Sequence, residues 1–574
     1  MLRNPESRLR LISLLLIALL LLVVGQLVRL QVFEHPRYVA EAKQMLERQY
    51  SLPAAPMGKI LDSNGALLVG NLPVFEVDAY LERTDETETA IPELAVILNR
   101  PEAELRTALT FPETYTGTHV WAPLARDVTS DTLRQVRAMN LRWVTITPTW
   151  KRYYAEGALA AHVLGFANAE GYGYGVQAYQ WRLIYTPPEF SAGAISGQNE
   201  PLPEEVARRS VTPVPGVNLR LTINRTIQAY VEGELDKALV EYQAEAGTII
   251  VMNPQTGEIL AMVSRPSYEP SRYADYAATN QSALFVDPAI SKAYEPGSVF
   301  KLITVASALD AGLVDTNWTY EDTGMLEYGG VVARNWDRAA HGVQDLEGLL
   351  ARSLNVGAAT LTTRVLGAER FYKSVAAFGF GQLTNVELAN EAQGLVHMPA
   401  DWDWQDGFLV TNSFGQGIAV TPLQMAAAVA AIANDGVMMR PHIVAERISS
   451  DGNSVLIAQT PIGQPISAEA AQTLTELMAR AMETRMKQAT VPGYRIAGKS
   501  GTAQIPVSGG YDPDDIIASF VGFGPLPDPQ VLILVKLDRP AIDPLLRWGS
   551  QTAAPLFQRI AARLFVLLQI PPTE

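Results

Sequence analysis

Tyr294-Glu295-Pro296-Gly297-Ser298-Val299-Phe300-Lys301 is the stretch from which the rest of the sequence is best interpreted. Pro296 and Gly297 interrupt what precedes them, and the apolar residues that follow Lys301 recur at helical spacing. The pattern predicts a helix that begins near Ser298, with Ser298 and Lys301 on one face because residues i and i+3 are neighbours there. A serine beside a lysine can form a nucleophile with its own base. Taken alone, Ser-x-x-Lys more often marks a helix cap and a solvated charge.

Composition limits the possible classes of protein. The chain has 574 residues, of which 48% are hydrophobic and 18% are charged, which is typical of a globular protein of two to four domains. Its net charge of −15 argues against a nucleic-acid partner. There is no cysteine, and the six histidines show no paired ligand spacing. We therefore predict no metal and no other cofactor.

The N-terminus has the pattern of a membrane anchor. Residues 1–10 carry three arginines, and an uncharged, leucine-rich run extends from Leu11 to Val28. We predict a cytoplasmic tail at 1–10 and a single transmembrane helix at 11–30, oriented by the positive-inside rule. A cleaved signal peptide is the alternative, but no Ala-x-Ala-like site ends the run. The remainder of the chain is then expected outside the cytoplasm.

Two further regions follow the predicted anchor. Residues 31–216 mix short helices, predicted among other places at 36–48 and 130–138, with strands and loops, and end in a connector rich in Pro, Gly, Ser and Glu at 186–216. Nothing in this region resembles a catalytic cluster, so it is interpreted as a structural module. From 217 to 574, a strand at 217–223, a helix at 226–242 and a hairpin at 247–263 precede many helices, among them 468–487, then two or three strands and a final helix at 553–568. This order predicts an α+β domain, an antiparallel sheet flanked by helices with a helical subdomain beside it.

Two more motifs lie in that C-terminal region. Ser353-Leu354-Asn355 follows a predicted helix at 344–352, and Lys499-Ser500-Gly501-Thr502 opens a predicted strand. Alone, the first could be a loop turn and the second a bulge. Together with Ser298-x-x-Lys301 and in this order, they match the triple signature of serine acyl-enzymes of the penicillin-binding and β-lactamase group.

The chain resembles the class B penicillin-binding proteins, which are monofunctional D,D-transpeptidases of peptidoglycan. The resemblance covers nearly the whole sequence. Segments similar to the family's elongated α+β pedestal, a dimerisation-type domain, and to its catalytic domain are Gly58–Gly65, Arg152–Phe166, Gly171–Gln177, Thr256–Met262, Phe414–Gly417 and Thr421–Gln424. Met57 stands where the family usually has arginine, Gln177 where it usually has glutamate, and the connector 181–203 does not match. The implied organisation is a pedestal at 31–216 and a transpeptidase domain at 217–574.

The resemblance and the residue chemistry together imply roles for the motif residues. Ser298 is expected to attack the D-Ala-D-Ala carbonyl of a stem peptide, and Lys301, desolvated beside Lys499, is expected to take its proton. Ser353 would relay the proton to the leaving D-alanine, and Asn355 would hold the substrate backbone.

The strand motif and two backbone groups complete the expected site. Ser500, Gly501 and Thr502, with the charge of Lys499, would bind the terminal carboxylate. The backbone N–H groups of Ser298 and Thr502 would form an oxyanion hole.

Several alternatives remain open on the sequence. Residues Gly493 to Ser500 satisfy the Gly-x-x-x-x-Gly-Lys-Ser pattern of a phosphate-binding loop, which requires a strand before it and a helix after it. A membrane-bound β-lactam sensor or β-lactamase would need only the C-terminal region, and a catalytically silent scaffold would not need three intact motifs. By resemblance, the partners are peptidoglycan stem peptides, β-lactams and a SEDS-type membrane glycosyltransferase, in cell elongation or division.

Overall fold

The computed structural model describes residues 5–35, 55–82, 88–110, 119–168, 170–186, 214–507 and 510–573. The chain divides into two compact units. Unit 1 contains residues 1–56, 73–151 and 186–215, and unit 2 contains residues 57–72, 152–185 and 216–574. The helix predicted at 36–48 and most of the predicted connector lie outside the described residues.

The N-terminal apolar run forms helix α1 (Pro5–Val28), which continues into a π-helical turn, η1 (Arg29–Phe33). Large apolar side chains along this helix, such as Leu20, Leu21 and Leu22, are more than half exposed. Among the residues that the structure describes, no helix combines the length and the apolar character needed to cross a membrane. The structure therefore does not support the spanning helix predicted at 11–30.

Between residues 73 and 151, unit 1 has long antiparallel strands and, among its described residues, three short helices. Strand β2 (Leu67–Glu82), which enters this unit at Pro73, pairs with β3 (His119–Val128) and with β4 (Val144–Tyr154). Helices α3 (Ile91–Ile97), α4 (Glu102–Leu109) and α5 (Ser130–Ala138) bury their apolar positions in one core. The predicted helix at 130–138 is confirmed. It begins where the Thr129 hydroxyl accepts a hydrogen bond from the Thr132 N–H, which satisfies a free donor of the first turn.

A small sheet in unit 2 collects strands from distant parts of the sequence. Its order is β16 (Ser454–Leu456), β15 (Val444–Ile448), β7 (Asn218–Leu221) and β1 (Ile60–Leu61), followed by the start of β2. The strand predicted at 217–223 is thus present, but it pairs parallel with β1 and antiparallel with β15. Short elements that adjoin these strands in sequence are α6 (Ala161–Leu164), β5 (Phe166–Ala167), β6 (Gly173–Tyr174), α7 (Gly175–Tyr179) and α8 (Trp181–Ile184).

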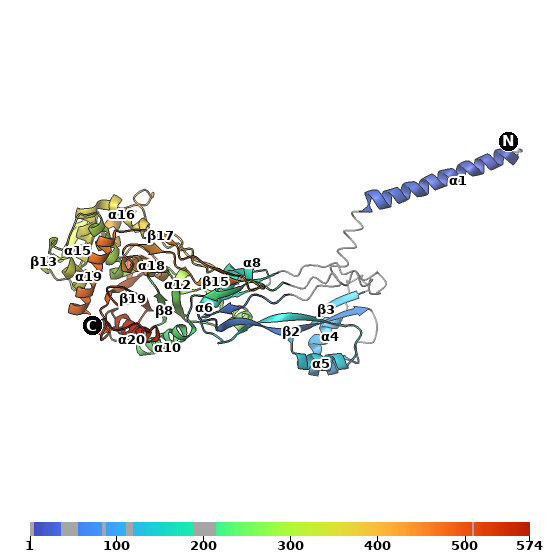
Figure 1. Cartoon of the computed structure of the whole chain (residues 1–574), viewed down its shortest axis with the longest axis horizontal. Helices are drawn as coiled ribbons and strands as arrows, with labels where there is room; N and C mark the ends of the chain where they lie inside the picture. The colour runs from blue at the N-terminus through green and yellow to red at the C-terminus, as the bar shows by residue number, and fades with distance from the viewer. Residues whose placement is uncertain are drawn as a thin grey trace. The chain divides into compact units, whose positions relative to one another are not determined.

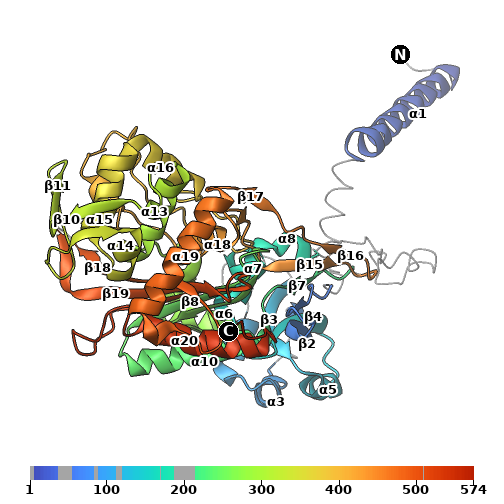
Figure 2. The same ribbon diagram turned by 60° about the vertical axis from the view of Figure 1, so that its left-hand side comes forward.

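The main sheet of unit 2 is antiparallel and has the order β18 (Ala497–Val507), β19 (Gly510–Gly524), β20 (Val531–Asp538), β8 (Ala246–Met252) and β9 (Ile259–Arg265). Successive side chains of a strand point to opposite faces. Ile249 and Val251 accordingly pack with α10 (Arg225–Glu241) and α20 (Ala553–Leu567). Ile250 and Met252 belong to the second core, which includes α13 (Lys301–Asp310), α18 (Pro422–Ala433) and α19 (Ala468–Arg485). Figures 1 and 2 show the sheet between these two groups of helices.

The remaining helical elements of unit 2 pack around this sheet or in the subdomain beside it. They are η3 (Pro270–Arg272), α11 (Tyr273–Ala278), η4 (Ser282–Phe285), α12 (Pro288–Ser291), η5 (Gly297–Phe300), α14 (Leu346–Arg352), α15 (Asn355–Thr360), η6 (Leu361–Leu366), α16 (Gly367–Ala377), α17 (Phe408–Asn412) and η7 (Lys487–Ala489).

Three two-stranded sheets accompany these helices. They pair β10 (Thr319–Asp322) with β13 (Gly342–Asp345), β11 (Met325–Tyr328) with β12 (Val331–Arg334), and β14 (Met438–Met439) with β17 (Pro461–Gly463). The predicted α+β class, with an antiparallel sheet and a helical subdomain, is confirmed. The four strands between 319 and 345 are not in the sequence prediction, because each has only four residues and the period-2 signal needs longer runs.

Candidate active site

Ser298 and Lys301 lie where a tight turn passes into a helix. Ser298 is in the 3-10 turn η5, and Lys301 begins α13. Gly297 has a φ of +55°, a conformation that glycine adopts readily and that lets the chain enter the turn. The Lys301 Nζ lies 3.0 Å from the Ser298 Oγ. Neither the turn nor the helix has a side-chain cap, so Ser298 is not the helix cap that an isolated Ser-x-x-Lys would suggest.

The Ser353-x-Asn355 motif occupies the bend between α14 and α15. Ser353 ends α14 in the left-handed region, with a φ of +57°, which is uncommon for a residue with a side chain. This bend brings its carbonyl oxygen to 2.6 Å and its Oγ to 3.2 Å from the Lys301 Nζ. The Asn355 side chain donates a hydrogen bond to the Arg334 carbonyl at 2.8 Å.

Lys499 reaches the same serine from the first strand of the main sheet. Its Nζ donates to the Ser353 Oγ at 3.0 Å and to the Ser500 carbonyl at 2.9 Å. The structure therefore brings residues of all three motifs together at Ser353. Ser500 is half-buried on β18, in register with Phe520 of β19.

Glycines allow the backbone of η5 to lie directly against β18. A Cβ on Gly297 would lie 2.8 Å from the Thr502 carbonyl oxygen, and a Cβ on Gly501 would lie 3.0 Å from the Pro296 carbonyl. Both separations are too short for larger residues. The Thr502 hydroxyl accepts a hydrogen bond from the Gly549 N–H at 3.1 Å. Ser298 and Thr502 are therefore held on adjoining segments.

Both lysines are buried without a compensating carboxylate among the described residues. Lys301 is fully buried and Lys499 is 4% exposed. Burial, together with the charge of Lys499, holds the pKa of Lys301 well below its usual range. Burial lowers the pKa of Lys499 to about 7. A neutral lysine amine has two N–H donors and one lone pair, so Lys301 can donate to Ser353 and still accept the Ser298 proton.

A buried carboxylate supports the loops around the site, and the sequence interpretation did not assign it. Glu295 accepts hydrogen bonds from the Gly417 N–H at 2.9 Å and from the Tyr511 hydroxyl at 3.2 Å. Burial raises the pKa of Glu295 above its usual range. Glu295 lies beside Pro296 within the stretch 294–301, which could have marked it as a candidate residue of the site. No local sequence pattern connects it to Tyr511.

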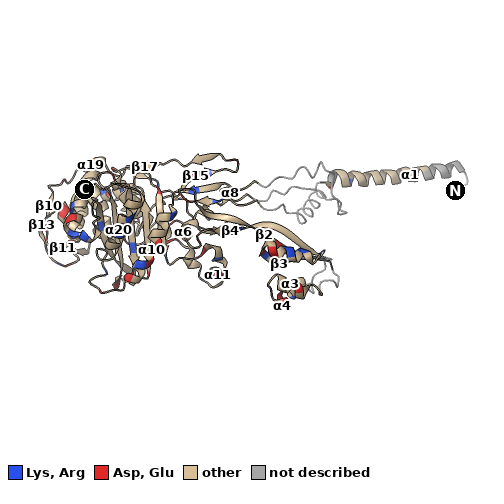
Figure 3. Cartoon of the chain, turned by 60° about the horizontal axis from the view of Figure 1, so that its bottom comes forward, with Lys and Arg blue, Asp and Glu red and all other residues tan. Residues whose placement is uncertain are grey.

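The competing phosphate-loop interpretation finds no support in the structure. Gly493 to Ser500 follows the helical turn η7 and runs directly into strand β18, so the strand before and the helix after that a phosphate loop needs are missing. The described residues contain no cluster of His, Asp or Glu suited to a metal ion. Acidic and basic residues are interspersed along the described chain (Figure 3).

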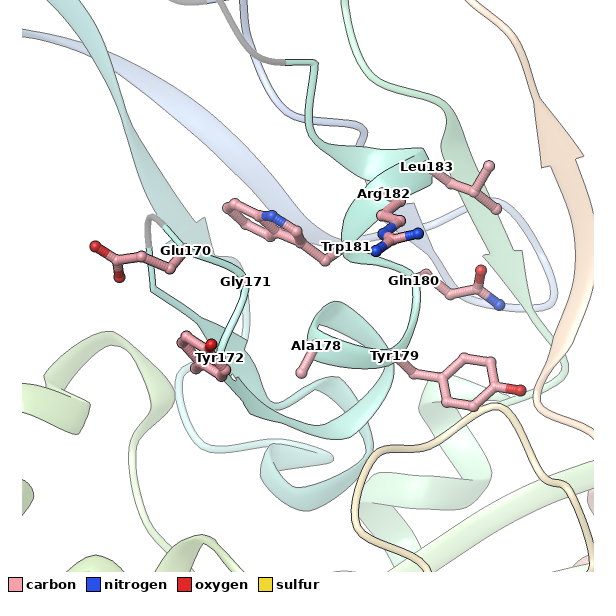
Figure 4. A pocket seen from close by; sticks show the side chains of 9 residues that line it. All are labelled: Glu170, Gly171, Tyr172, Ala178, Tyr179, Gln180, Trp181, Arg182 and Leu183. Carbon is pink, nitrogen blue, oxygen red and sulfur yellow. The ribbon is translucent and has the colours of Figure 1, made fainter.

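A pocket of about 370 Å³ lies elsewhere in unit 2. Residues between Glu170 and Leu183 line it, including Tyr172, Trp181 and Arg182 (Figure 4). None of the predicted site residues is part of it.

Comparisons with known proteins agree with this geometry. Residues 247–562 match the penicillin-binding protein transpeptidase domain, and residues 53–177 match the penicillin-binding protein dimerisation domain. The stage V sporulation protein D of Bacillus subtilis is 31% identical over 535 residues, which cover 91% of this chain and 80% of that protein. A probable peptidoglycan D,D-transpeptidase, PenA, of Neisseria meningitidis is 28% identical over 98% of this chain and 94% of its own length.

Solved structures show the same fold. A crystal structure of penicillin-binding protein 3 from Mycobacterium tuberculosis, complexed with aztreonam, superposes with a TM-score of 0.67 at 26% identity. The alignment covers 91% of this chain and 98% of that one. The matches extend over both the catalytic cluster and the strands and helices that hold it. The chain therefore belongs to the penicillin-binding proteins with a transpeptidase domain, in agreement with the resemblance seen in its motifs.

Proposed function

We propose that the chain is a peptidoglycan D,D-transpeptidase that cross-links stem peptides through an acyl-enzyme on Ser298. The observation that carries the proposal is the position of the Lys301 amine, buried and 3.0 Å from the Ser298 Oγ. A β-lactam, whose strained amide resembles the D-Ala-D-Ala bond, would acylate the same serine.

In the acylation step, Ser298 attacks the penultimate D-alanine carbonyl while neutral Lys301 takes the hydroxyl proton. The lowered pKa of Lys301 favours this neutral form. The backbone N–H groups of Ser298 and Thr502 would stabilise the resulting oxyanion. One such donor contributes a factor of about 100 to 1,000 in rate.

The tetrahedral intermediate collapses when the leaving D-alanine nitrogen receives a proton. Ser353 is suited to this relay because its Oγ lies within 3.2 Å of the Lys301 Nζ and 3.0 Å from the Lys499 Nζ. The acyl-enzyme is then attacked by the amine of a second stem peptide, which loses its proton through the same groups. The products are the cross-linked peptide and free Ser298.

The donor would bind to strand β18 and to the bend between α14 and α15, on either side of Ser298. Ser500 and Thr502 hydroxyls, with the charge of Lys499, would hold the terminal carboxylate, and Gly501 lets strand β18 approach η5 closely. The Asn355 amide would hold the backbone carbonyl of the donor.

Covalent labelling tests this proposal. A fluorescent penicillin should label the full chain, and Ser298→Ala should abolish the label while the melting temperature stays close to that of the wild type. Equal labelling of both proteins would refute the acyl-enzyme. A label that forms and then hydrolyses within seconds would instead favour the β-lactamase alternative.

We also propose the domain organisation predicted from the sequence. Residues 1–10 and 11–30 would be a cytoplasmic tail and an anchor, 31–216 a pedestal, and 217–574 an extracytoplasmic transpeptidase domain. Exposed leucines on α1 and the family matches to 53–177 and 247–562 support this division. Deletion of residues 1–30 should release the protein from membranes into the soluble fraction; retention in the membrane would refute the anchor.

A SEDS-type glycosyltransferase is the partner proposed for the anchor and pedestal, because the family models matched at 53–177 and 247–562 are a dimerisation domain and a transpeptidase domain. Co-purification of the full chain with such a membrane protein, compared with the 1–30 deletion, tests the assignment. If the full chain does not retain such a protein, the proposed partner is wrong.

A further inference from the structure

Two tryptophan rings meet beside the catalytic cluster. Trp336 and Trp548 have ring centroids 5.9 Å apart with planes inclined at 60°. Trp336 is 61% exposed and Trp548 is 37% exposed, whereas the lysine amines of the site are buried. The pair therefore lies on the solvent side of the site.

Trp336 is attached to the wall of the site that carries Ser353. Its indole N–H donates to the Arg352 carbonyl at 3.1 Å, immediately before Ser353. The two residues before it are bound to the same bend, since Asn355 donates to the Arg334 carbonyl at 2.8 Å and the Val356 N–H donates to the Asn335 side chain at 3.2 Å. These three hydrogen bonds hold Trp336 in a fixed relation to Ser353 and Asn355.

Trp548 is attached to the opposite wall, the strand that carries Thr502. Its neighbour Gly549 donates a backbone hydrogen bond to the Thr502 hydroxyl at 3.1 Å. A Cβ on Gly549 would lie 2.1 Å from the Gly501 carbonyl oxygen, so the two backbones are in direct contact. The Trp548 indole N–H is occupied by the Pro544 carbonyl at 3.1 Å.

We propose that Trp336 and Trp548 form a clasp across the mouth of the site, which selects acyl donors by the bulk of the group that projects toward solvent. The inference rests on the proposed function. A donor must lie between the Ser353 wall and the Thr502 wall, and the two rings join these walls. A small donor fits beneath closed rings, while a bulky donor requires them to part.

The clasp is weak enough to act as a filter. The Trp336 indole is hydrogen-bonded to the Ser353 wall and the Trp548 indole to Pro544 in its own loop, and the two rings meet by ring contact without a hydrogen bond between them among the described residues. An aromatic pair of this kind shifts an equilibrium by about two- to tenfold. Loss of either ring should therefore accelerate acylation by bulky donors about two- to tenfold and leave small donors nearly unaffected.

Acylation rates of the full chain test the proposal. Intact-protein mass spectrometry would follow acylation by 6-aminopenicillanic acid, which has no acyl side chain, and by a penicillin that carries a fluorophore. Trp336→Ala and Trp548→Ala should each raise the ratio of bulky to small rates two- to tenfold. Trp336→Phe, which keeps an aromatic ring, should stay near the wild-type ratio. Trp402→Ala is the matched control, because Trp402 is 97% exposed and outside the site.

An unchanged ratio in both alanine variants, or a selective fall for the bulky penicillin, would overturn the clasp. These results differ from failure of the proposed function, in which Ser298→Ala would be labelled as well as the wild type.

A second measurement uses the absence of cysteine from the chain. A Trp336→Cys/Trp548→Cys variant joined by a short bis-maleimide should keep reacting with 6-aminopenicillanic acid and lose reaction with the fluorescent penicillin. Each single cysteine variant, treated in the same way, is the control. Equal reaction of the joined protein with both compounds would overturn the proposal.

Discussion

Arg152 and Lys301 are buried cations in the same unit, and they differ in what burial does to them. The Arg152 guanidinium donates to the Gln177 side chain at 2.9 Å, the Gly58 carbonyl at 2.9 Å and the Asn71 side chain at 3.0 Å. Among the described residues, the Lys301 Nζ forms hydrogen bonds to serine oxygens alone, those of Ser298 and Ser353. Neither cation has a carboxylate partner in the described part of the chain.

The difference lies in the head groups. Burial lowers the pKa of Arg152 to about 10, so the guanidinium stays charged at neutral pH and holds its three acceptors. An amine starts from 10.5, and burial beside Lys499 lowers the pKa of Lys301 well below that value, which favours the neutral amine. Desolvation thus leaves Arg152 as a charged hydrogen-bond donor, whereas it favours the neutral amine at Lys301.

Substitutions of Lys301 should have the largest effect, a loss of penicillin acylation. Lys301→Met removes the base, and Lys301→Arg keeps a cation that does not release its proton. Both should lower the rate of penicillin acylation by about 100- to 10,000-fold, the contribution of a general base. Stopped-flow labelling would measure it. Fast acylation of the arginine variant would show that charge alone suffices.

Arg152→Met is expected to have the opposite profile. Three oxygen acceptors would lose their donor, which should lower the free energy of unfolding by about 2–4 kcal/mol. Acylation per folded molecule should not change, because Arg152 does not contact the site. Denaturant unfolding and labelling of the same samples would test both parts. A loss of acylation at full stability would contradict the structural role.

Lys499→Met should stabilise the protein while it weakens acylation. The pKa of Lys499 is about 7 in the folded chain and 10.5 without burial, so the folded state binds fewer protons between these values. The cost of burying the amine is therefore complete below pH 7 and falls as pH rises toward 10.5. The variant should gain about 1–3 kcal/mol at pH 6 and less at pH 9. A gain that is larger at pH 9 would contradict the shift.

Gln177→Glu should have the smallest effect. The glutamate that the family usually carries would pair with Arg152, but the amide donations of Gln177 to the Gly165 carbonyl at 2.7 Å and to Tyr154 at 2.8 Å would be lost. We expect a net destabilisation of about 1 kcal/mol at pH 8. It should shrink at pH 5, where a protonated glutamate donates again. Stabilisation at pH 8 would mean that charge outweighs the lost donors.

Local patterns predicted much of this molecule. The helix at 130–138, the hairpin of β8 and β9, and the helices α10, α19 and α20 follow from apolar periodicity and turn residues. The three motifs identified the residues that meet at Ser353. Each of these signals extends over a few residues of the chain.

The same local patterns did not predict which distant segments of the chain pack or pair with one another. The strand at 218–221 pairs with β1 and β15. Many apolar segments of the chain could pair with such a strand, and its own sequence does not specify which of them does. Strand β8 lies beside β20, which is nearly 300 residues later in the sequence. The contact of Trp336 with Trp548 and that of Glu295 with Tyr511 likewise depend on which loops the packed core brings together.

The sequence by itself determined the candidate nucleophile, the two lysines and the order of the motifs, because the chemistry of Ser298, Lys301 and Lys499 belongs to the side chains and their spacing. Only the tertiary structure decided that the pKa of Lys301 is lowered by burial and that the Ser353 hydroxyl is shared between two amines. Desolvation and hydrogen-bond distance are properties of the packed domain, where residues 298, 353 and 499 meet.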